Sequence, residues 1–242
     1  MNIADLPPVA ALLHAASSAI DAVSSLLAPL AGASATALAI VVVTLLLRVA
    51  LIPVGRSQVR AEAGRRRLGP KLAELRKRFA RDPRRLQRET LALHAAERVS
   101  PIAGLLPALA QAPVVSLVYG VFTHPVIAGQ ANGLLAQHLV GIPLGASLVS
   151  LAGALSPATL VVFGILLGVI VATVIVGRRE NRRWMPPAES ATAARVAGVL
   201  GWLPLVTVAV AAVVPLAAAL YLTVTTVWTQ AERAILRRAI LT

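Results

Sequence analysis

Cysteine is missing from all 242 residues of this chain. Disulfides, thiolate metal sites and cysteine nucleophiles are therefore excluded. Positive charge is also missing from the first part of the chain, because Arg48 is the first lysine or arginine. An ordinary secretory signal peptide begins with a positively charged stretch, so we do not expect one here.

Aromatic residues are scarce at 3%, yet hydrophobic residues make up 57% of the chain and the mean hydropathy is +0.79. A soluble domain of this length has no core large enough to bury so much apolar material. The composition predicts an all-α, polytopic membrane protein.

Basic residues occur in blocks, and their placement decides what the net charge of +13 means. Fourteen lysines and arginines lie in 56–98, five in 178–195 and three in 233–238, which with Arg48 accounts for all 23. Because the blocks alternate with apolar segments, they indicate cytoplasmic loops rather than a DNA-binding surface. The predicted topology places the N-terminus outside, the C-terminus in the cytoplasm and the protein in the plasma membrane.

The apolar segments predict five transmembrane helices, at 34–53, 102–122, 157–176, 196–212 and 216–230. Between them we expect a cytoplasmic helical hairpin at 55–99 and an external loop at 124–156, apolar enough to lie in the membrane interface. Residues 1–31 form a separate external segment, and 32–242 form the five-helix core.

Helical periodicity accounts for the segments outside the expected spans. An amphipathic interfacial helix in 1–31 is indicated by the spacing of Val9, Leu13, Ile20, Val23, Leu27 and Leu30. The hairpin has two apolar stripes, formed by Leu68, Leu72, Leu75 and Phe79 and by Leu86, Thr90, Leu93 and Glu97. Asp82 and Pro83 supply the N-cap and the first-turn proline of its second helix.

Arg48 lies within the first expected span, roughly 10 Å from the polar run that begins at Gly55, at about 1.5 Å rise per residue. An arginine at the centre of a membrane helix costs about 2.5–3.5 kcal/mol, so it normally faces protein or a watery cavity. The alternative is that its side chain reaches the interface. We favour the cavity.

The five expected spans contain no Asp, Glu, Lys or His. This argues against proton pumps and ion-coupled transporters, which use such groups within the membrane. The chain also lacks HExxH and a glycine-rich phosphate loop, so we expect no enzyme activity, metal or cofactor. The polar side chains of the spans have two interpretations: each makes an interhelical hydrogen bond or lies at a solvated end, or together with Arg48 they line a hydrated groove. The residues assigned to the groove beside Arg48 are Thr44, Gln111, Ser116, Thr173, Tyr221 and Thr225.

The order of these features resembles the YidC family of membrane protein insertases, in a short form without a large extracytoplasmic domain. Three stretches support the resemblance, LLLRVALIP at 45–53, the segment 68–114 and the segment 213–238. The second is the most specific, because its basic hairpin turns at Arg81-Asp82-Pro83 and then enters a span through Ser100-Pro101, Leu106-Pro107 and Gln111-x-Pro113.

The resemblance implies an insertase and chaperone with a hydrophilic groove that is open to the cytoplasm and the lipid and closed outside. Arg48 would attract polar or acidic parts of a nascent membrane protein, without covalent chemistry or nucleotide. The hairpin would recruit partners such as the ribosome, a targeting receptor or the general secretion channel, and contact anionic lipid. The hairpin residues assigned to recruitment are Arg65, Lys71, Arg76, Lys77, Arg81, Asp82, Arg84 and Arg85.

Two other functions fit the residues. In an anion transporter or channel, Arg48 would line a continuous path across the membrane. In a scaffold that moves nothing, the basic hairpin would bind lipid or ribosomal RNA.

Overall fold

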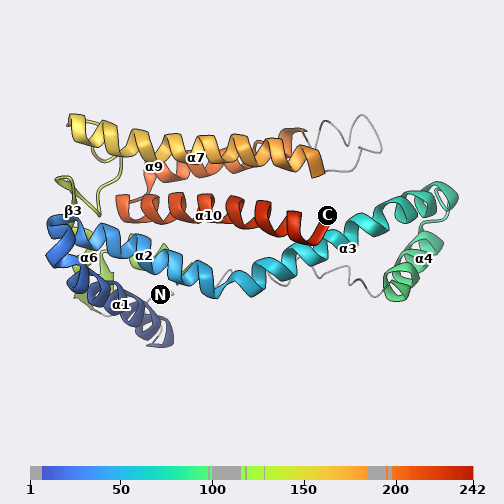
Figure 1. Cartoon of the computed structure of the whole chain (residues 1–242), viewed down its shortest axis with the longest axis horizontal. Helices are drawn as coiled ribbons and strands as arrows, with labels where there is room; N and C mark the ends of the chain where they lie inside the picture. Colours follow the sequence, from blue (N-terminus) through green and yellow to red (C-terminus); the bar gives the residue numbers. More distant parts are fainter. Residues whose placement is uncertain are drawn as a thin grey trace.

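The computed structural model describes residues 7–97, 99, 116–117, 119–127, 129–184, 195 and 198–241, which are mostly helical as predicted. Figure 1 shows α10 in the middle of a layered arrangement, with α7 and α9 on one side and α2 and α3 on the other. The elements are α1 (Pro7–Ala31), η2 (Gly32–Ser34), α2 (Ala35–Ala50), α3 (Ile52–Arg78), α4 (Pro83–Ala96), β1 (Val126–Ile127), β2 (Gln130–Ala131), α6 (Gly133–Ala136), β3 (His138–Leu139), β4 (Ile142–Pro143), α7 (Pro157–Trp184), η3 (Leu203–Leu205), α9 (Val206–Val213) and α10 (Leu216–Leu241).

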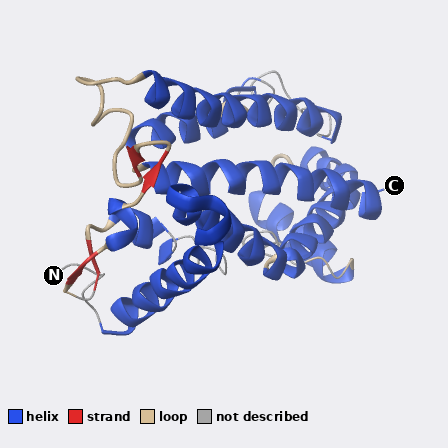
Figure 2. Cartoon of the chain, turned by 60° about the vertical axis from the view of Figure 1, so that its left-hand side comes forward, coloured by secondary structure: helices blue, strands red, loops and turns tan. Residues whose placement is uncertain are grey.

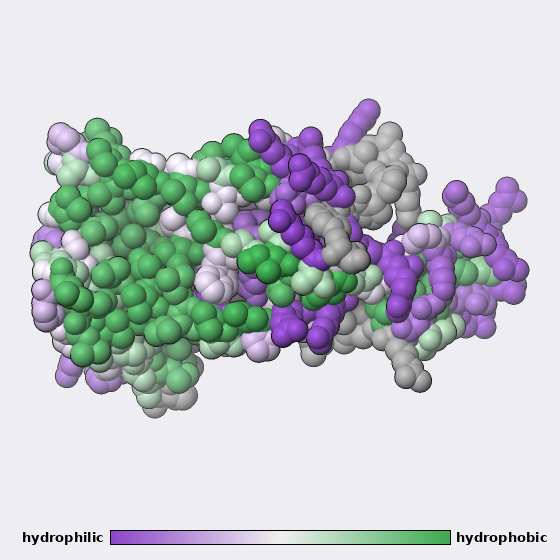
Figure 3. Space-filling model, in the orientation of Figure 1, coloured by the Kyte–Doolittle hydropathy of each residue, from purple (hydrophilic) through white to green (hydrophobic). Residues whose placement is uncertain are grey.

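Apolar side chains cover the outside of one end of the molecule, whereas polar side chains cover the other end (Figure 3). Two stretches of the described chain are long and apolar enough to cross a membrane, Val9–Ala50 and Pro157–Arg183. The outward apolar residues of α7 include Val161 and Ile165, which are 59% and 60% exposed. An exposed apolar surface of this extent fits contact with lipid.

The helix predicted in 1–31 is α1, and most of its predicted apolar face points to the interior. Leu13 and Ile20 are buried in the main hydrophobic core, with Val9, Val23 and Leu27 packed against it. Leu30, the last of the predicted apolar positions, is 87% exposed. The face ends where the chain turns through η2 into α2, the helix against which α1 packs. The short strands that contact α1 and η2 are drawn in red in Figure 2.

A junction at Leu51 separates α2 from α3. Pro53 has no backbone N–H, so the hydrogen-bond ladder is interrupted at its position. The amide of Leu51 still donates to Leu47 O at 3.0 Å, and that of Gly55 donates to Leu51 O at 3.2 Å. The two helices therefore follow one another closely, and α3 continues into the polar end of the molecule (Figure 1).

At its far end α3 connects to α4, which folds back beside it (Figure 1). Asp82 Oδ1 accepts a 3.0 Å hydrogen bond from Arg85 N, which confirms the predicted N-cap. Leu68 is fully buried, whereas the other members of the two predicted stripes are partly buried. Glu97 contacts Lys71 of α3, and the hydrogen bond and charge of that lysine lower the pKa of the Glu97 carboxyl.

The segment predicted as an external loop is more ordered than expected, because it folds into two short β-hairpins and α6. Leu134 and Leu144 are fully buried. The amides of Leu216 and Ala217, at the start of α10, donate to Ala146 O at 2.8 Å and to Leu144 O at 3.0 Å. First-turn amides of a helix have no acceptor within it, so the segment is ordered partly by capping α10.

The segment expected to form one span at 196–212 is interrupted. Helical residues 198–200 are followed by a turn and by η3, and α9 begins at Val206. Pro204 lies within this interruption and lacks the amide that a continuous helix would use. The tight turn predicted around Pro215 connects α9 to α10.

The side chain of Arg237, in α10, connects this helix to α3 and α7. Its Nε and Nη2 donate to Glu62 Oε2 of α3 at 3.2 and 3.1 Å, and its Nη1 donates to Asn181 Oδ1 of α7 at 2.7 Å. Only 9% of the residue is exposed. Glu62, Asn181 and Arg237, here called the three-helix clasp, hold α3 and α7 against α10.

Asp82→Ala removes the N-cap of α4. An exposed cap of this kind contributes about 1 kcal/mol, so hydrogen exchange should quicken about fivefold in the first turn of α4. Gln87→Ala, on the exposed surface of the same helix, is the matched control. Unchanged protection in Asp82→Ala would show that the cap does not hold the helix.

Arg237→Gln removes the guanidinium that contacts both oxygens of Glu62, and leaves that carboxylate the longer 3.9 Å ion pair with Arg66. Removing one partner of a largely buried pair is costly, and we expect a loss of about 1–3 kcal/mol in the free energy of unfolding. Thermal unfolding in detergent measures the change, with Arg179→Gln on the exposed surface of α7 as control. Equal stability of the two variants would contradict the role of the clasp.

Candidate functional site

Arg48 lies in the last turn of α2, and only 5% of it is exposed. Carbonyl groups at a helix C-terminus carry partial negative charge, which favours a cation at this position. Its Nε is buried without a hydrogen-bond partner among the described residues. The Arg48 side chain therefore lies inside the protein and not on its surface. This burial fits the interpretation that Arg48 faces a cavity.

A pocket of about 350 Å³ opens beside Arg48, between the α2–α3 junction and α10. Its walls combine charged and apolar side chains of the α2–α3 junction, α3 and α10. They are formed by Arg48, Leu51, Gly55, Gln58, Val59, Glu62, Arg65, Thr229, Glu232, Arg233, Leu236 and Arg237. The junction lies near the border between the apolar and polar ends of the molecule (Figures 1 and 3).

The pocket contains carboxylates, which the sequence analysis did not expect beside Arg48. Glu232 lies two residues beyond the expected end of the last span, but α10 continues without interruption to Leu241. Its Oε2 accepts a 3.0 Å hydrogen bond from Trp228 Nε1, one helical turn earlier. Burial raises the pKa of the Glu232 carboxyl, while Trp228 and the charges of Arg48 and Arg233 act in the opposite direction.

The other residues predicted for the groove lie away from this pocket or outside the described residues. Thr44 is buried, and its hydroxyl donates to Ile40 O at 2.6 Å on its own helix. Thr173 makes the same bond to Val169 O at 2.7 Å. Ser116 is exposed, and Gln111 lies outside the described residues.

Two predicted groove residues belong to the packed part of α10. Tyr221 is 1% exposed and packs against Phe122, with ring centroids 6.1 Å apart. The hydroxyl of Thr225 is buried without a partner among the described residues. Neither residue lines the pocket around Arg48, so the structure brings Arg48 together with the later turns of α10 instead.

The sequence analysis missed Glu62 and Glu232 because it searched only within the expected spans. Trp228 lies inside the last expected span, and it was missed because tryptophan was not counted among the polar side chains. One signal in the sequence was available. Thr225, Thr229, Glu232 and Leu236 recur at helical spacing, so they share one face of α10 beyond the expected end of the span. A helix face that stays polar beyond the expected end of its span indicates that the helix lines a hydrated site.

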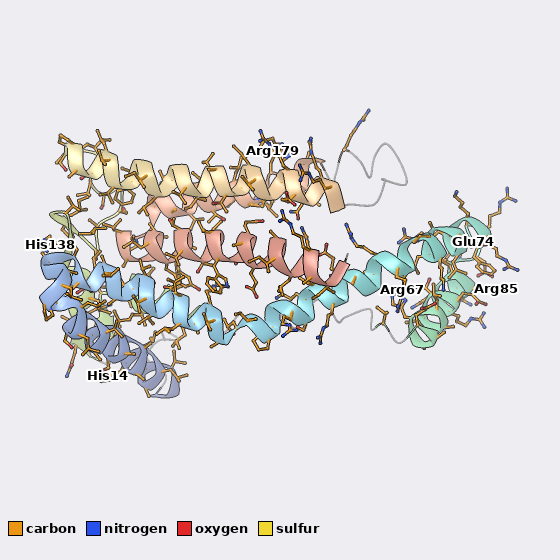
Figure 4. The ribbon with its side chains drawn as sticks, in the orientation of Figure 1. His14, Arg67, Glu74, Arg85, His138 and Arg179 are labelled. Atoms are coloured by element: carbon orange, nitrogen blue, oxygen red, sulfur yellow. The ribbon has the colours of Figure 1, made fainter. Side chains whose placement is uncertain are left out.

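The predicted recruitment residues lie along α3, α4 and the turn between them, toward the polar end of the molecule. Figure 4 places Arg67, Glu74 and Arg85 at this end, and His14 and His138 near the opposite end. The guanidinium of Arg85 lies 4.9 Å from the centre of the Phe79 ring, and Lys71 contacts Glu97. Lys77, Arg81 and Arg84 are exposed, as are Arg76 and Asp82, whereas Arg65 also lines the pocket.

The chemistry that these groups provide is reversible binding of a polar or anionic group. The described residues contain no cluster of three or more His, Asp or Glu that could hold a metal ion. Arginine side chains bind carboxylates through charge-assisted hydrogen bonds, and a partly enclosed site strengthens such bonds.

Comparison of the sequence with known proteins identifies its family. The family described as "60Kd inner membrane protein" matches residues 27–241. Proteins named "Membrane protein insertase YidC" are similar, including that of Pasteurella multocida (36% identity over 120 residues, 46% of this chain and 22% of that protein). Those of Histophilus somni strain 2336 (39% over 89 residues, 37% and 16%) and Xanthomonas campestris (38% over 96 residues, 40% and 17%) are similar too.

The matched region covers less than a quarter of each of these relatives. The family match is far more extensive, because it includes α2, α3, α4, α7, α9 and α10 and thus every wall of the Arg48 pocket. This chain therefore belongs to the 60Kd inner membrane protein family, the YidC/Oxa1 family.

Proposed function

We propose that this protein is a membrane protein insertase and chaperone of the plasma membrane. The observation that carries the proposal is the buried guanidinium of Arg48, which lies in a pocket at the border between the apolar and polar ends of the molecule. Membership of the family supports the same function.

In this proposal Arg48 is a docking charge for a polar or acidic segment of a nascent membrane protein. The segment binds at the pocket without a covalent step or nucleotide, and its apolar neighbours move into the lipid beside the groove. Moving a polar tail across a shortened apolar path costs less free energy than moving it across the full bilayer. Thr44, Gln111, Ser116, Thr173, Tyr221 and Thr225 remain candidates for the deeper groove.

The proposed topology has five spans, with the N-terminus outside and the C-terminus in the cytoplasm. Residues 1–31 form an external interfacial segment, 32–242 the core, and 124–156 an external segment. It is supported by the concentration of basic residues in 56–98, 178–195 and 233–238. α3 and α4 then extend into the cytoplasm as a basic hairpin.

The hairpin is proposed to recruit partners. Its exposed basic residues favour anionic lipid and nucleic-acid phosphate, so the ribosome is a candidate partner beside a targeting receptor and the secretion channel. The residues proposed for this role are Arg65, Lys71, Arg76, Lys77, Arg81, Asp82, Arg84 and Arg85.

Replacing Arg48 tests the proposal. In proteoliposomes, Arg48→Ala should reduce insertion of a substrate with an acidic translocated tail about 10-fold, the equivalent of about 1.4 kcal/mol of lost interaction. Arg48→Lys should retain part of the activity, because the charge remains while the planar fork is lost. A substrate with a neutral tail should be much less affected.

Arg179→Ala, on the exposed surface of α7, is the control for loss of one positive charge. Photo-crosslinking of a stalled nascent chain from Leu51, in the pocket wall, should exceed crosslinking from Val161 on the outer face of α7. Unchanged insertion by Arg48→Ala would contradict the docking mechanism. Chloride flux through liposomes with the purified protein would favour an anion transporter instead.

A further inference from the structure

The Arg48 pocket contains two buried polar atoms without hydrogen-bond partners among the described residues, Arg48 Nε and Glu232 Oε1. One is a donor and the other an acceptor. A buried polar atom without a partner costs about 1–3 kcal/mol, so each atom gains from a ligand that satisfies it. The pair lies where the proposed substrate would dock.

The two carboxylates of the pocket differ in how firmly they are held. Both oxygens of Glu62 lie 3.1–3.2 Å from Arg237 nitrogens, in the three-helix clasp. Within the described part of the chain, Glu232 has one side-chain hydrogen bond, from Trp228 on its own helix. Glu62 is thus a fixed part of the wall, whereas Glu232 can change its rotamer at the cost of one hydrogen bond.

Glu232 is surrounded by charges from three helices. Arg48 belongs to α2, Glu62 and Arg65 to α3, and Arg233 and Arg237 to α10. Of the basic groups, Arg48 and Arg233 interact electrostatically with the Glu232 carboxylate. Arg48 and the Glu232 carboxylate thus attract each other across the pocket that both line, and the described contacts include no hydrogen bond between them.

Gly55 makes this position of the carboxylate possible. A Cβ atom built on Gly55 would overlap the Glu232 carboxylate, which lies against the backbone of the first turn of α3. The close approach allows a side chain of α10 to reach the α2–α3 junction. Glu232 is therefore positioned inside the docking site rather than at its rim.

We propose that Glu232 is a tethered counter-charge that competes with the acidic segment of a substrate for Arg48. The inference rests on the proposed function and adds a specificity rule to it. In the resting protein Glu232 screens Arg48, so a weakly acidic or neutral chain gains little by entering. A strongly acidic segment outcompetes Glu232, which moves toward Arg233.

The absence of cysteine allows the pocket charge to be measured without any insertion assay. Thr229→Cys places a thiol in the pocket wall, and Gln58→Cys provides a second reporter on α3. The rates of modification by an anionic and a cationic methanethiosulfonate reagent give a ratio that reports the local potential. Adding Glu232→Gln should raise the anionic-to-cationic ratio about 3- to 10-fold, whereas Arg48→Gln should lower it by a similar factor.

Glu180→Gln is the matched control, because Glu180 pairs with Arg183 on α7 and does not line the pocket. It should leave the ratio within about 1.5-fold of the parent, since a screened charge at a distance contributes little. An unchanged ratio in Glu232→Gln would overturn the counter-charge. Failure of both reporters to react would overturn it too, because no aqueous anion would then reach Arg48.

Competition is tested by insertion into proteoliposomes. Glu232→Gln should raise insertion of a substrate with one aspartate in its tail about 2- to 5-fold, and change a neutral-tailed substrate little. Equal effects on the two tails would overturn the specificity rule. Unchanged insertion by Arg48→Ala contradicts the docking function itself, whereas an unchanged reagent ratio in Glu232→Gln contradicts only the counter-charge.

Discussion

The burial of one guanidinium organises this molecule. Arg48 is 5% exposed at the end of α2, and a charge in that position is stable only where protein groups replace the water it has lost. The carbonyl end of α2, the polar wall of α3 and the later turns of α10 surround it, while its Nε has no hydrogen-bond partner among the described residues. Each wall comes from a different part of the chain, so the site exists only when these helices are packed together.

The clasp and the pocket form two parts of one cluster of charge. Glu62 and Arg237 line the pocket while their mutual contacts, with Asn181, fasten α3 and α7 to α10. Charges used in the clasp are satisfied and hold their positions. Among the described residues, Arg48 and Glu232 each retain a buried atom without a hydrogen-bond partner, which a ligand would satisfy. A glutamate and an arginine thus hold helices together in the clasp, and another glutamate and arginine form the proposed binding site.

The segment at the opposite end also contributes to this arrangement. Residues 142–149 accept hydrogen bonds from the start of α10 and donate one to α9 at Ala212, so they fix the end of α10 that lies away from the pocket. Because α10 is held at its first turn and again at Arg237, it has little freedom to slide along its axis. α10 can therefore present Thr229 and Glu232 to Arg48 at a defined position.

Local patterns in the sequence were enough to predict the helical membrane architecture, the capped turn at Asp82 and membership of the family. These depend on composition, helical periodicity and nearby residues, all of which are readable along the chain. Local patterns missed the carboxylates beside Arg48, because Glu232 is far from it in sequence and lies beyond the expected end of its span. Only the tertiary structure decided which side chains share the pocket, since the continuation of α10 and its close approach at Gly55 are set by packing between distant helices.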